Sequence, residues 1–284
     1  THDDFPFKVD VSIVKKSKEN KKFPIPVYNF VDSKTLQSLE HYEIEIEFDN
    51  EKIKNILQDL QIGPPEKSVD SSDTTAYQDK VQKTLTSILH TKIKKVIRYI
   101  LSGLQETNYP ISYPEMNDVL QEYMKILWQQ NYKENTKILP RNFIGPSQYT
   151  LHLQNILPPD ENVNEPNIRD NYTVTEKADG DRKLLFINNK GKLFLITTNM
   201  AVQFTGAKTD NKELFNTVID GEHILYNKKR EFINLYAAFD IYYINNKDVR
   251  ALEFTASNMK TQNYRLVQLT LALKNLSEFS VIKK

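Results

Sequence analysis

The sequence of 284 residues contains no cysteine, and no run of about 18 apolar residues occurs in it. The absence of cysteine excludes disulfide bonds and thiolate zinc sites, and it is typical of a reducing compartment such as the cytoplasm. Without a long apolar run no transmembrane helix is predicted, so a membrane is not an expected partner. The five histidines show no metal-ligand spacing. Because the formal net charge is only +1, binding to a nucleic acid would require local basic patches.

Hydrophobic residues make up 39% of the chain, which is enough for two domains that each bury a core. Apolar periodicity predicts strands over 5–16 and 41–48, and helices over 50–62, 77–104, 114–128 and 264–276. Breaker and polar residues predict a loop over 63–73, and strands dominate the prediction from Tyr172 to Tyr243. No internal repeat is apparent, so the pattern favours a mixed α+β protein.

The decapeptide TVTEKADGDR, residues 173–182, is the most informative segment. The segment matches the pattern K-x-D-G-x-R at Lys177, Asp179, Gly180 and Arg182. At average residue usage, this pattern would occur by chance in only about a few of every thousand chains of this length. A lysine amine attacks the α-phosphorus of a nucleotide only when it is deprotonated, so its ordinary pKa of ~10.4 must be lowered by burial or by a cation.

Each neighbour in this pattern suits that chemistry. Arg182 is a permanent cation that can also bind phosphate oxygens, and Asp179 can accept hydrogen bonds from the lysine or from a nucleotide hydroxyl. Gly180 permits a positive φ or a close backbone approach. The alternative is a β-hairpin corner, because Asp-Gly is a strong turn signal between two apolar segments.

Two downstream segments extend the pattern. NTVIDGEHILYN carries Asp220, Gly221 and Glu222, and INLYAAFDIYYIN carries Phe239 and Asp240. In order and approximate spacing, the three segments resemble motifs I, III and IIIa of the covalent nucleotidyltransferases. This superfamily comprises the mRNA capping guanylyltransferases and the polynucleotide ligases.

The resemblance implies a role for each matching residue. Lys177 becomes the catalytic nucleotidyl-lysine, and the nucleotide-binding residues are Asp179, Gly180, Arg182, Glu222 and Phe239. Arg182 would contact phosphate or ribose, Glu222 would bind the ribose or organise a metal, and Phe239 would stack on the base. A stack of this kind is worth ~1–3 kcal/mol. The alternative for Phe239 is a core aromatic residue, which is the expectation for Tyr242 and Tyr243.

The first fifty residues carry a second pattern. In HYEIEIEFDN, three glutamates alternate with apolar residues, so a strand would place Glu43, Glu45 and Glu47 on one face. An acidic strand face ordinarily meets water. Upstream, however, FKVDVSIVKK places Lys8 and Asp10 on one polar face, where Lys8 could supply the opposite charge. Because alternate side chains on a strand lie ~6.5–7 Å apart, one ion cannot readily bind all three glutamates directly.

These two strands resemble the C-terminal strands of the triphosphate tunnel RNA triphosphatases, which precede the guanylyltransferase in capping enzymes of large cytoplasmic DNA viruses. The resemblance implies that Glu43, Glu45 and Glu47 bind Mg²⁺ or Mn²⁺ and that Lys8 and Lys15 bind phosphate. It favours capping over ligation. Residues 139–156 also resemble the segment that precedes the lysine motif in viral capping enzymes.

The expected architecture is α+β. Residues 1–62 would form part of an antiparallel β tunnel of the triphosphate tunnel type, and 63–138 a helical segment that completes this domain and connects it onward. Residues 139–284 would form the N-terminal part of an antiparallel-sheet nucleotidyltransferase domain of the ATP-grasp-like ligase and capping type. No segment matches the N-terminal glutamate strand of the tunnel or motifs IV and V of the transferase, so we expect a piece of a larger enzyme.

The expected function is mRNA 5′ capping in the cytoplasm or virion, by an RNA 5′-triphosphatase and a guanylyltransferase that uses GTP. The expected partners are the nascent RNA 5′ end and a methyltransferase domain or subunit. Two alternatives remain open. One is an ATP-dependent RNA or DNA ligase, and the other is a catalytically inactive scaffold.

Overall fold

The computed structural model describes residues 2–20, 23–61, 71–158, 166–169, 172–255, 264–276 and 282–283. The chain divides into two units, Thr1–Ile100 and Leu101–Lys284, and each is described by itself. The described residues form four α-helices and three sheets, in which all strand pairs except one are antiparallel. The predicted α+β class is therefore confirmed.

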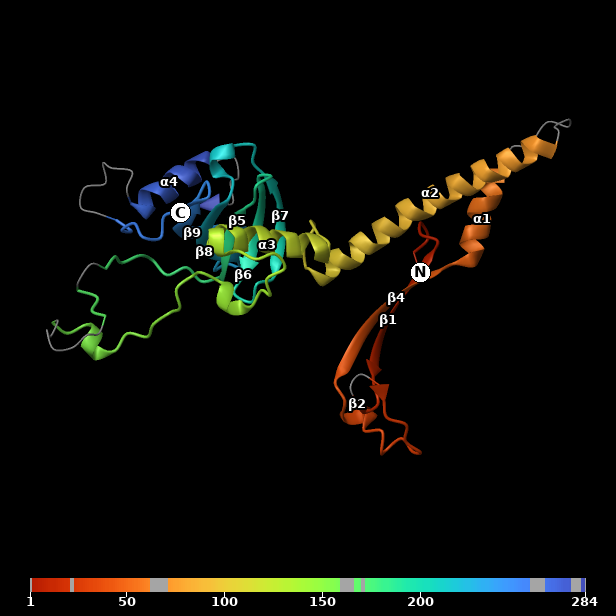
Figure 1. Cartoon of the computed structure of the whole chain (residues 1–284), viewed down its shortest axis with the longest axis horizontal. Helices are drawn as coiled ribbons and strands as arrows, with labels where there is room; N and C mark the ends of the chain where they lie inside the picture. The colour runs from red at the N-terminus through yellow and green to blue at the C-terminus, as the bar shows by residue number, and fades with distance from the viewer. Residues whose placement is uncertain are drawn as a thin grey trace. The chain divides into compact units, whose positions relative to one another are not determined.

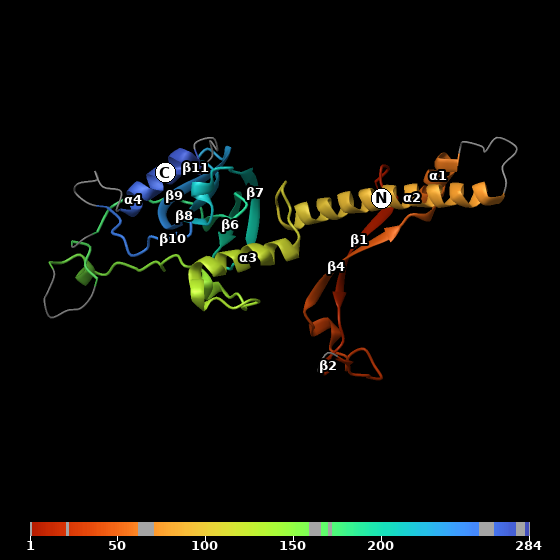
Figure 2. The ribbon, with the colours of Figure 1, turned by 45° about the horizontal axis from the view of Figure 1, so that its top comes forward.

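The first unit is built on two long paired strands, β1 (Phe7–Lys15) and β4 (Glu40–Phe48). They pair antiparallel in an unbroken register from Phe7 opposite Phe48 to Lys15 opposite Glu40. Between them lie the short strands β2 (Glu19–Asn20) and β3 (Phe23–Pro24), and after them come helices α1 (Asn50–Gln61) and α2 (Ser71–Leu104), whose last turn belongs to the second unit. Figures 1 and 2 show β1 and β4 as a long two-stranded ribbon.

The core of this unit is small. Phe5, Phe7 and Val96 are buried, and partly buried residues of α2 and β4 pack around them. Farther along the ribbon, Val11 and Ile13 expose 71% and 63% of their surface. A two-stranded sheet is marginally stable alone, and here it has a packed base and an uncovered apolar face. In the described part of the chain β1 and β4 pair only with each other, so the closed tunnel stays a prediction.

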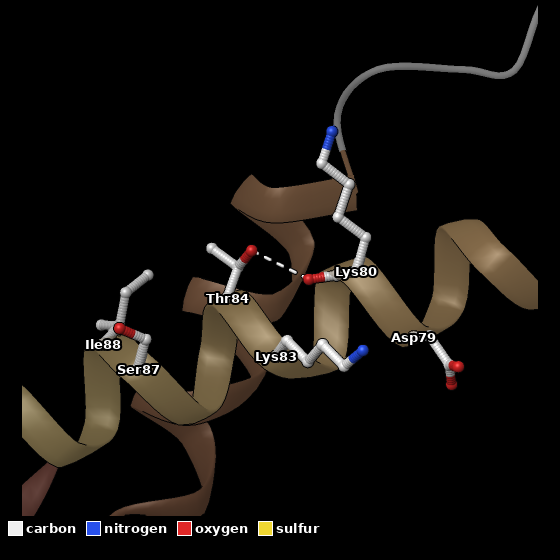
Figure 3. A pocket seen from close by; sticks show the side chains of 6 residues that line it. All are labelled: Asp79, Lys80, Lys83, Thr84, Ser87 and Ile88. Carbon is white, nitrogen blue, oxygen red and sulfur yellow. Dashed lines mark hydrogen bonds between the residues drawn. The ribbon is translucent and has the colours of Figure 1, made fainter.

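A hollow of about 600 Å³ lies along α2 (Figure 3). Its lining side chains all come from this one helix and include Asp79, Lys80 and Lys83. The Lys80 and Lys83 ammonium groups point in different directions, so their charges do not meet at one point (Figure 3). The Thr84 hydroxyl donates to the Lys80 carbonyl at 2.8 Å, which is an ordinary local helix bond. This hollow therefore does not gather catalytic groups.

The second unit contains a sheet with strand order β10-β9-β8-β5-β6-β7, and β11 pairs parallel with β9. Its strands are β5 (Asp181–Ile187), β6 (Lys192–Thr197), β7 (Val202–Lys208), β8 (Thr217–Tyr226), β9 (Phe232–Ile244), β10 (Lys247–Asp248) and β11 (Ile282–Lys283). The central strands β5 and β8 are rich in buried aliphatic residues because both faces of the sheet are covered.

Two helices cover opposite faces of this sheet (Figures 1 and 2). Helix α3 (Tyr113–Trp128) begins with Ser112, whose side chain accepts a hydrogen bond from the Glu115 amide at 3.3 Å. Its buried face, which includes Tyr123 and Met124, packs on one side of the sheet, which we call the α3 face. Helix α4 (Arg265–Asn275) packs on the other side, which we call the α4 face. The predicted helices over 114–128 and 264–276 are thus confirmed.

Two predictions are corrected. Helix α2 begins at Ser71 rather than at Tyr77, and most of the predicted loop over 63–73 lies outside the described residues. The described segment from Tyr172 to Gly180 is irregular, and the first strand of the sheet begins only at Asp181. The Asp-Gly pair therefore leads into a strand instead of joining two strands, and the hairpin alternative is wrong.

Candidate active site

Lys177 lies in the irregular segment that enters β5. Its side chain is 81% exposed, and its Nζ lies 3.8 Å from Asp179 Oδ1. The same Nζ donates to the carbonyl of Ala178 at 3.2 Å. These contacts are local to the loop, so the amine is accessible to a ligand but is not enclosed.

Gly180 fixes this loop to the sheet. Its amide donates to Glu222 Oε2 at 2.9 Å, across 42 residues of sequence. A Cβ at Gly180 would lie 2.7 Å from the carbonyl oxygen of His223 and 2.8 Å from Ile224, so only glycine fits without displacing the strand. Of the two roles predicted for Gly180, the structure shows the close backbone approach. The segments that resemble motifs I and III therefore meet directly.

Arg182 forms the most buried ion pair of the described residues. Its Nε and Nη2 donate to the two carboxylate oxygens of Asp220 at 3.2 and 2.5 Å, and Asp220 is fully buried. The hydroxyl of Tyr242 donates to Asp220 Oδ2 at 2.5 Å. The hydrogen bonds to Asp220 raise the pKa of the Arg182 guanidinium, and burial, together with the charge of Asp220, raises the pKa of Tyr242. The Arg182–Asp220 ion pair is thus held in the sheet with the help of the Tyr242 hydroxyl.

Two aromatic rings flank the Arg182 guanidinium. Its Cζ lies 5.6 Å from the ring centre of Phe143 and 5.8 Å from that of Phe239. Nη1 also donates to the carbonyl of Pro146 at 2.5 Å, and a Cβ at Gly145 would lie only 2.6 Å from Nη2. Residues 143–146 belong to the segment predicted to precede the lysine motif, and the structure places them against that motif.

Four of the five predicted nucleotide-binding residues lie together around the start of β5: Gly180, Arg182, Glu222 and Phe239. Arg182 and Glu222 are register partners across β5 and β8, and Phe239 in β9 contacts Arg182. Asp179 is fully exposed beside Lys177. Tyr242 and Tyr243 are buried core aromatics, as predicted. Asp220 was missed as a site residue, although an acid within the apolar run TVIDGE was a signal that it has a buried partner.

A second polar chain lies on the α4 face and was also missed. Lys183 Nζ lies 2.9 Å from His223 Nδ1, and His223 Nε2 lies 2.8 Å from Asn234 Oδ1. Because an ammonium group only donates, Nδ1 accepts and the imidazole proton resides on Nε2. Burial lowers the pKa of Lys183. Burial and the nearby charge of Lys183 lower the pKa of His223, although its bond to Asn234 and the charge of Asp181 act in the opposite direction.

This lowered pKa predicts a loss of stability in mild acid. The unfolded chain binds a proton at His223 near pH ~6.5, whereas the folded chain binds it only at lower pH. Stability therefore falls as the pH drops through ~6.5 and stops falling below the folded pKa, with a slope of at most about 1.4 kcal/mol per pH unit. Urea unfolding between pH 7.5 and 5.5 should show this loss in the native chain and a smaller loss in His223→Gln. Equal losses would contradict it, and the exposed His152→Gln serves as the control.

The structure places the N-terminal candidates on the ribbon of β1 and β4. Lys8 pairs in register with Glu47, Asp10 with Glu45 and Ser12 with Glu43, so these side chains share one face. Lys15 falls on the opposite face by strand alternation and pairs with Glu40 at 3.4 Å. The structure therefore does not bring Lys8 and Lys15 together.

These carboxylates do not assemble a metal site by themselves. Among the described residues no three His, Cys, Asp or Glu side chains are close enough to hold one ion. This agrees with the spacing of alternate residues on one strand, which keeps Glu43, Glu45 and Glu47 apart. Metal binding by this face stays a prediction. In the described residues no helix is long and apolar enough to span a membrane.

Comparison with known proteins finds a family match within the second unit. Residues 161–270 match the protein family described as "mRNA capping enzyme, catalytic domain". The matched segment contains Lys177, the Gly180–Glu222 contact and the Arg182–Asp220 pair.

A particular relative agrees with this match. Over 147 residues, or 52% of its length, the chain is 31% identical to a protein of Acanthamoeba polyphaga mimivirus named "Probable mRNA-capping enzyme". The aligned region spans 11% of that relative's length. The predicted resemblance to viral mRNA capping enzymes is confirmed over these aligned residues.

Proposed function

We propose that the second unit is the N-terminal part of an mRNA guanylyltransferase in which Lys177 carries GMP. The observation that carries this proposal is the convergence of three sequence motifs at one end of the sheet. The Gly180 amide joins motif I to motif III through Glu222, and the Arg182 guanidinium lies against Phe239 of motif IIIa. A nucleotide placed there would have the lysine amine, a cation, a carboxylate and an aromatic ring within one site.

The proposed reaction has two steps. The neutral amine of Lys177 attacks the α-phosphorus of GTP, forms a P–N bond and displaces pyrophosphate, while its proton leaves to solvent. A β-phosphate oxygen of an RNA 5′-diphosphate then attacks the same phosphorus, the P–N bond breaks, and the lysine amine is restored on reprotonation. The RNA receives the GMP group.

Within this chain, each contact has a positioning role. The bond from Gly180 to Glu222 fixes the loop that bears Lys177, so a bound triphosphate meets the amine in a limited range of positions. Three Arg182 nitrogens are already engaged, by Asp220 and by the Pro146 carbonyl. We therefore assign Arg182 mainly to holding Phe239 and the strand ends in place, with its remaining N–H groups available to phosphate or ribose.

The exposed amine of Lys177 must be enclosed before it reacts. At 81% exposure its side chain is open to solvent. We infer that closure around GTP excludes water from the amine and brings a cation close to it, both of which favour the neutral form of a lysine. A divalent cation bound to the triphosphate would offset its charge when present.

We also propose, from resemblance and strand register, that β1 and β4 belong to an RNA 5′-triphosphatase tunnel. The shared face of Lys8, Glu45 and Glu47 supports the polar interior, and the uncovered apolar face with Val11 and Ile13 supports packing against further structure. This activity would supply the RNA 5′-diphosphate that the second step consumes. A cytoplasmic or virion location and a methyltransferase partner complete the proposal.

The test is to incubate the intact protein with α-labelled GTP or ATP, denature it, and look for retained label. We expect label from GTP that is released by pyrophosphate, because reversal of the first step regenerates GTP. Label from ATP alone would indicate a ligase instead. Absence of label from both nucleotides, in a protein that is folded by circular dichroism, would favour the inactive scaffold.

A further inference from the structure

The hairpin between β8 and β9 carries an unusual combination of side chains. Its tip is the tripeptide Lys228, Lys229 and Arg230, and the tip is flanked by Tyr226 and Phe232. All five side chains are exposed, with 58% exposure at Tyr226 and 66% at Phe232. Within the described part of the chain, no ion pair engages any of the three cations. We call residues 226–232 the basic hairpin.

Hydrogen bonds of the Asn227 side chain order the turn of the basic hairpin. Asn227 Oδ1 accepts hydrogen bonds from the amides of Lys229 and Glu231 at 2.9 and 3.0 Å, and its Nδ2 donates to Glu231 Oε2 at 2.6 Å. Arg230 adopts a left-handed φ of 62°, and its amide donates to the Asn227 carbonyl at 2.9 Å. The carboxylate of Glu231 is thus bound to Asn227 within the turn. The side chain of Asn227 thus fixes the backbone that bears three consecutive cations.

The two flanking aromatic rings line a groove on the α4 face, next to the three cations. Tyr226 and Phe232 are register partners with ring centres 5.7 Å apart in an edge-on arrangement. Both line a cavity of about 570 Å³, together with Leu225, His223 and Asn234. Tyr109 also lines the cavity, and its ring lies so close to Gly206 that a Cβ there would be 2.5 Å away. The groove therefore offers aromatic faces and polar edges beside a cationic tip.

The strand register places this surface near the segment that bears Lys177 and enters β5, which we call the lysine loop. Strand β5 begins at Asp181, opposite His223, so β8 extends past it from Ile224 to Tyr226. The lysine loop crosses β8 at this point, because Gly180 meets His223 and Ile224. Lys228 lies four positions after Ile224 and β8 ends at Tyr226, so the two residues are at most about 13 Å apart.

We propose that the basic hairpin and its groove bind the single-stranded 5′ segment of the RNA that accepts GMP. This inference rests on the proposed function, since it assigns a docking surface for the acceptor of the second step. Phosphates would contact Lys228, Lys229 and Arg230, and one or two bases would stack on Tyr226 and Phe232. The combination of cations with exposed rings favours single-stranded RNA over a duplex, whose bases are not free to stack on side chains.

The test is direct binding of the 284-residue chain to a fluorescent 12-nucleotide RNA with a 5′-diphosphate, measured by anisotropy over a range of salt concentrations. In the charge variant, Lys228→Gln, Lys229→Gln and Arg230→Asn are combined, because asparagine tolerates the left-handed position. The matched control combines Lys133→Gln, Lys137→Gln and Arg141→Asn, which removes the same charge from exposed sites of the same unit. A third variant combines Tyr226→Leu and Phe232→Leu.

The charge variant should reduce the slope of log K against log salt by about 2, since each phosphate contact to a single strand contributes about 0.7. The aromatic variant should weaken binding about five-fold to a hundred-fold and leave the slope unchanged. The control triple should change neither quantity as strongly. Equal weakening by both triple variants, or equal affinity for a duplex RNA or for polyglutamate, would overturn the proposal. Thermal unfolding shows whether each variant is folded.

The outcome is separable from that of the proposed function. Binding of RNA by this chain does not require the GMP adduct, and formation of the adduct does not require RNA. An adduct at Lys177 without any effect of the charge variant on RNA binding would refute the docking surface alone. Hairpin-dependent RNA binding without an adduct would refute the proposed function alone.

Discussion

Lys177→Ala is expected to reduce the covalent GMP adduct of the intact protein to background. A phosphoramidate requires a primary amine that can lose a proton, and an alanine at this position does not supply one. Lys177→Arg should fail equally, because a guanidinium keeps the positive charge but is not deprotonated in proteins. Since the side chain is 81% exposed and makes only local contacts, either change should alter stability by no more than ~0.5 kcal/mol.

The measurement is retained label after denaturation with α-labelled GTP, with peptide mapping of the labelled site. Lys190→Ala is the matched control, because Lys190 is an exposed lysine in the turn after β5 and should leave the label unchanged. Label that persists in Lys177→Ala would remove this lysine from the mechanism. Such a result would leave the fold relationship intact, since the family match does not depend on the adduct.

Local sequence patterns predicted much of the fold. Strand alternation predicted that Lys8, Asp10 and the glutamates share one face. Strands β1 and β4 do pair so that these side chains lie next to one another on that face. Helical periodicity located α3 and α4 to within about two residues at each end. These features depend on neighbours along the chain, which is the information that periodicity contains.

The parts of the site that were missed depend on contacts between distant residues. The Arg182–Asp220 pair spans 38 positions and the Lys183–His223 contact spans 40. The apolar run around Asp220 hints that this carboxylate has a buried partner, but nothing in the local pattern indicates that the partner is Arg182 or that His223 meets a lysine. The irregular entry into β5 was missed for a similar reason: the Gly180 amide bonds to the side chain of Glu222, and that bond exists only once β8 is in place. The three motifs were nonetheless recognisable, because their residue types are chemically constrained.

The Arg182–Asp220 pair yields the largest expected effect on stability. Asp220→Asn leaves the guanidinium, which is only 20% exposed, without its carboxylate, and breaking a buried pair in this way costs about 3–5 kcal/mol. Arg182→Met should be similarly costly, because it leaves a fully buried carboxylate with Tyr242 as a remaining donor. The double variant should be more stable than the sum of the two losses predicts, since it removes both charges together.

Urea unfolding of the native chain, the two single variants and the double variant measures this coupling as a double-mutant cycle. Asp210→Asn is the control, because Asp210 is 94% exposed beside Lys208 and its removal should change stability by no more than ~0.5 kcal/mol. A loss in Asp220→Asn no larger than that of the control would show that the pair does not hold the sheet. Strict additivity would show that the two charges act independently. If instead the coupling is large, the same substitutions should displace Phe143 and Phe239, because both rings are positioned by the guanidinium that Asp220 fixes.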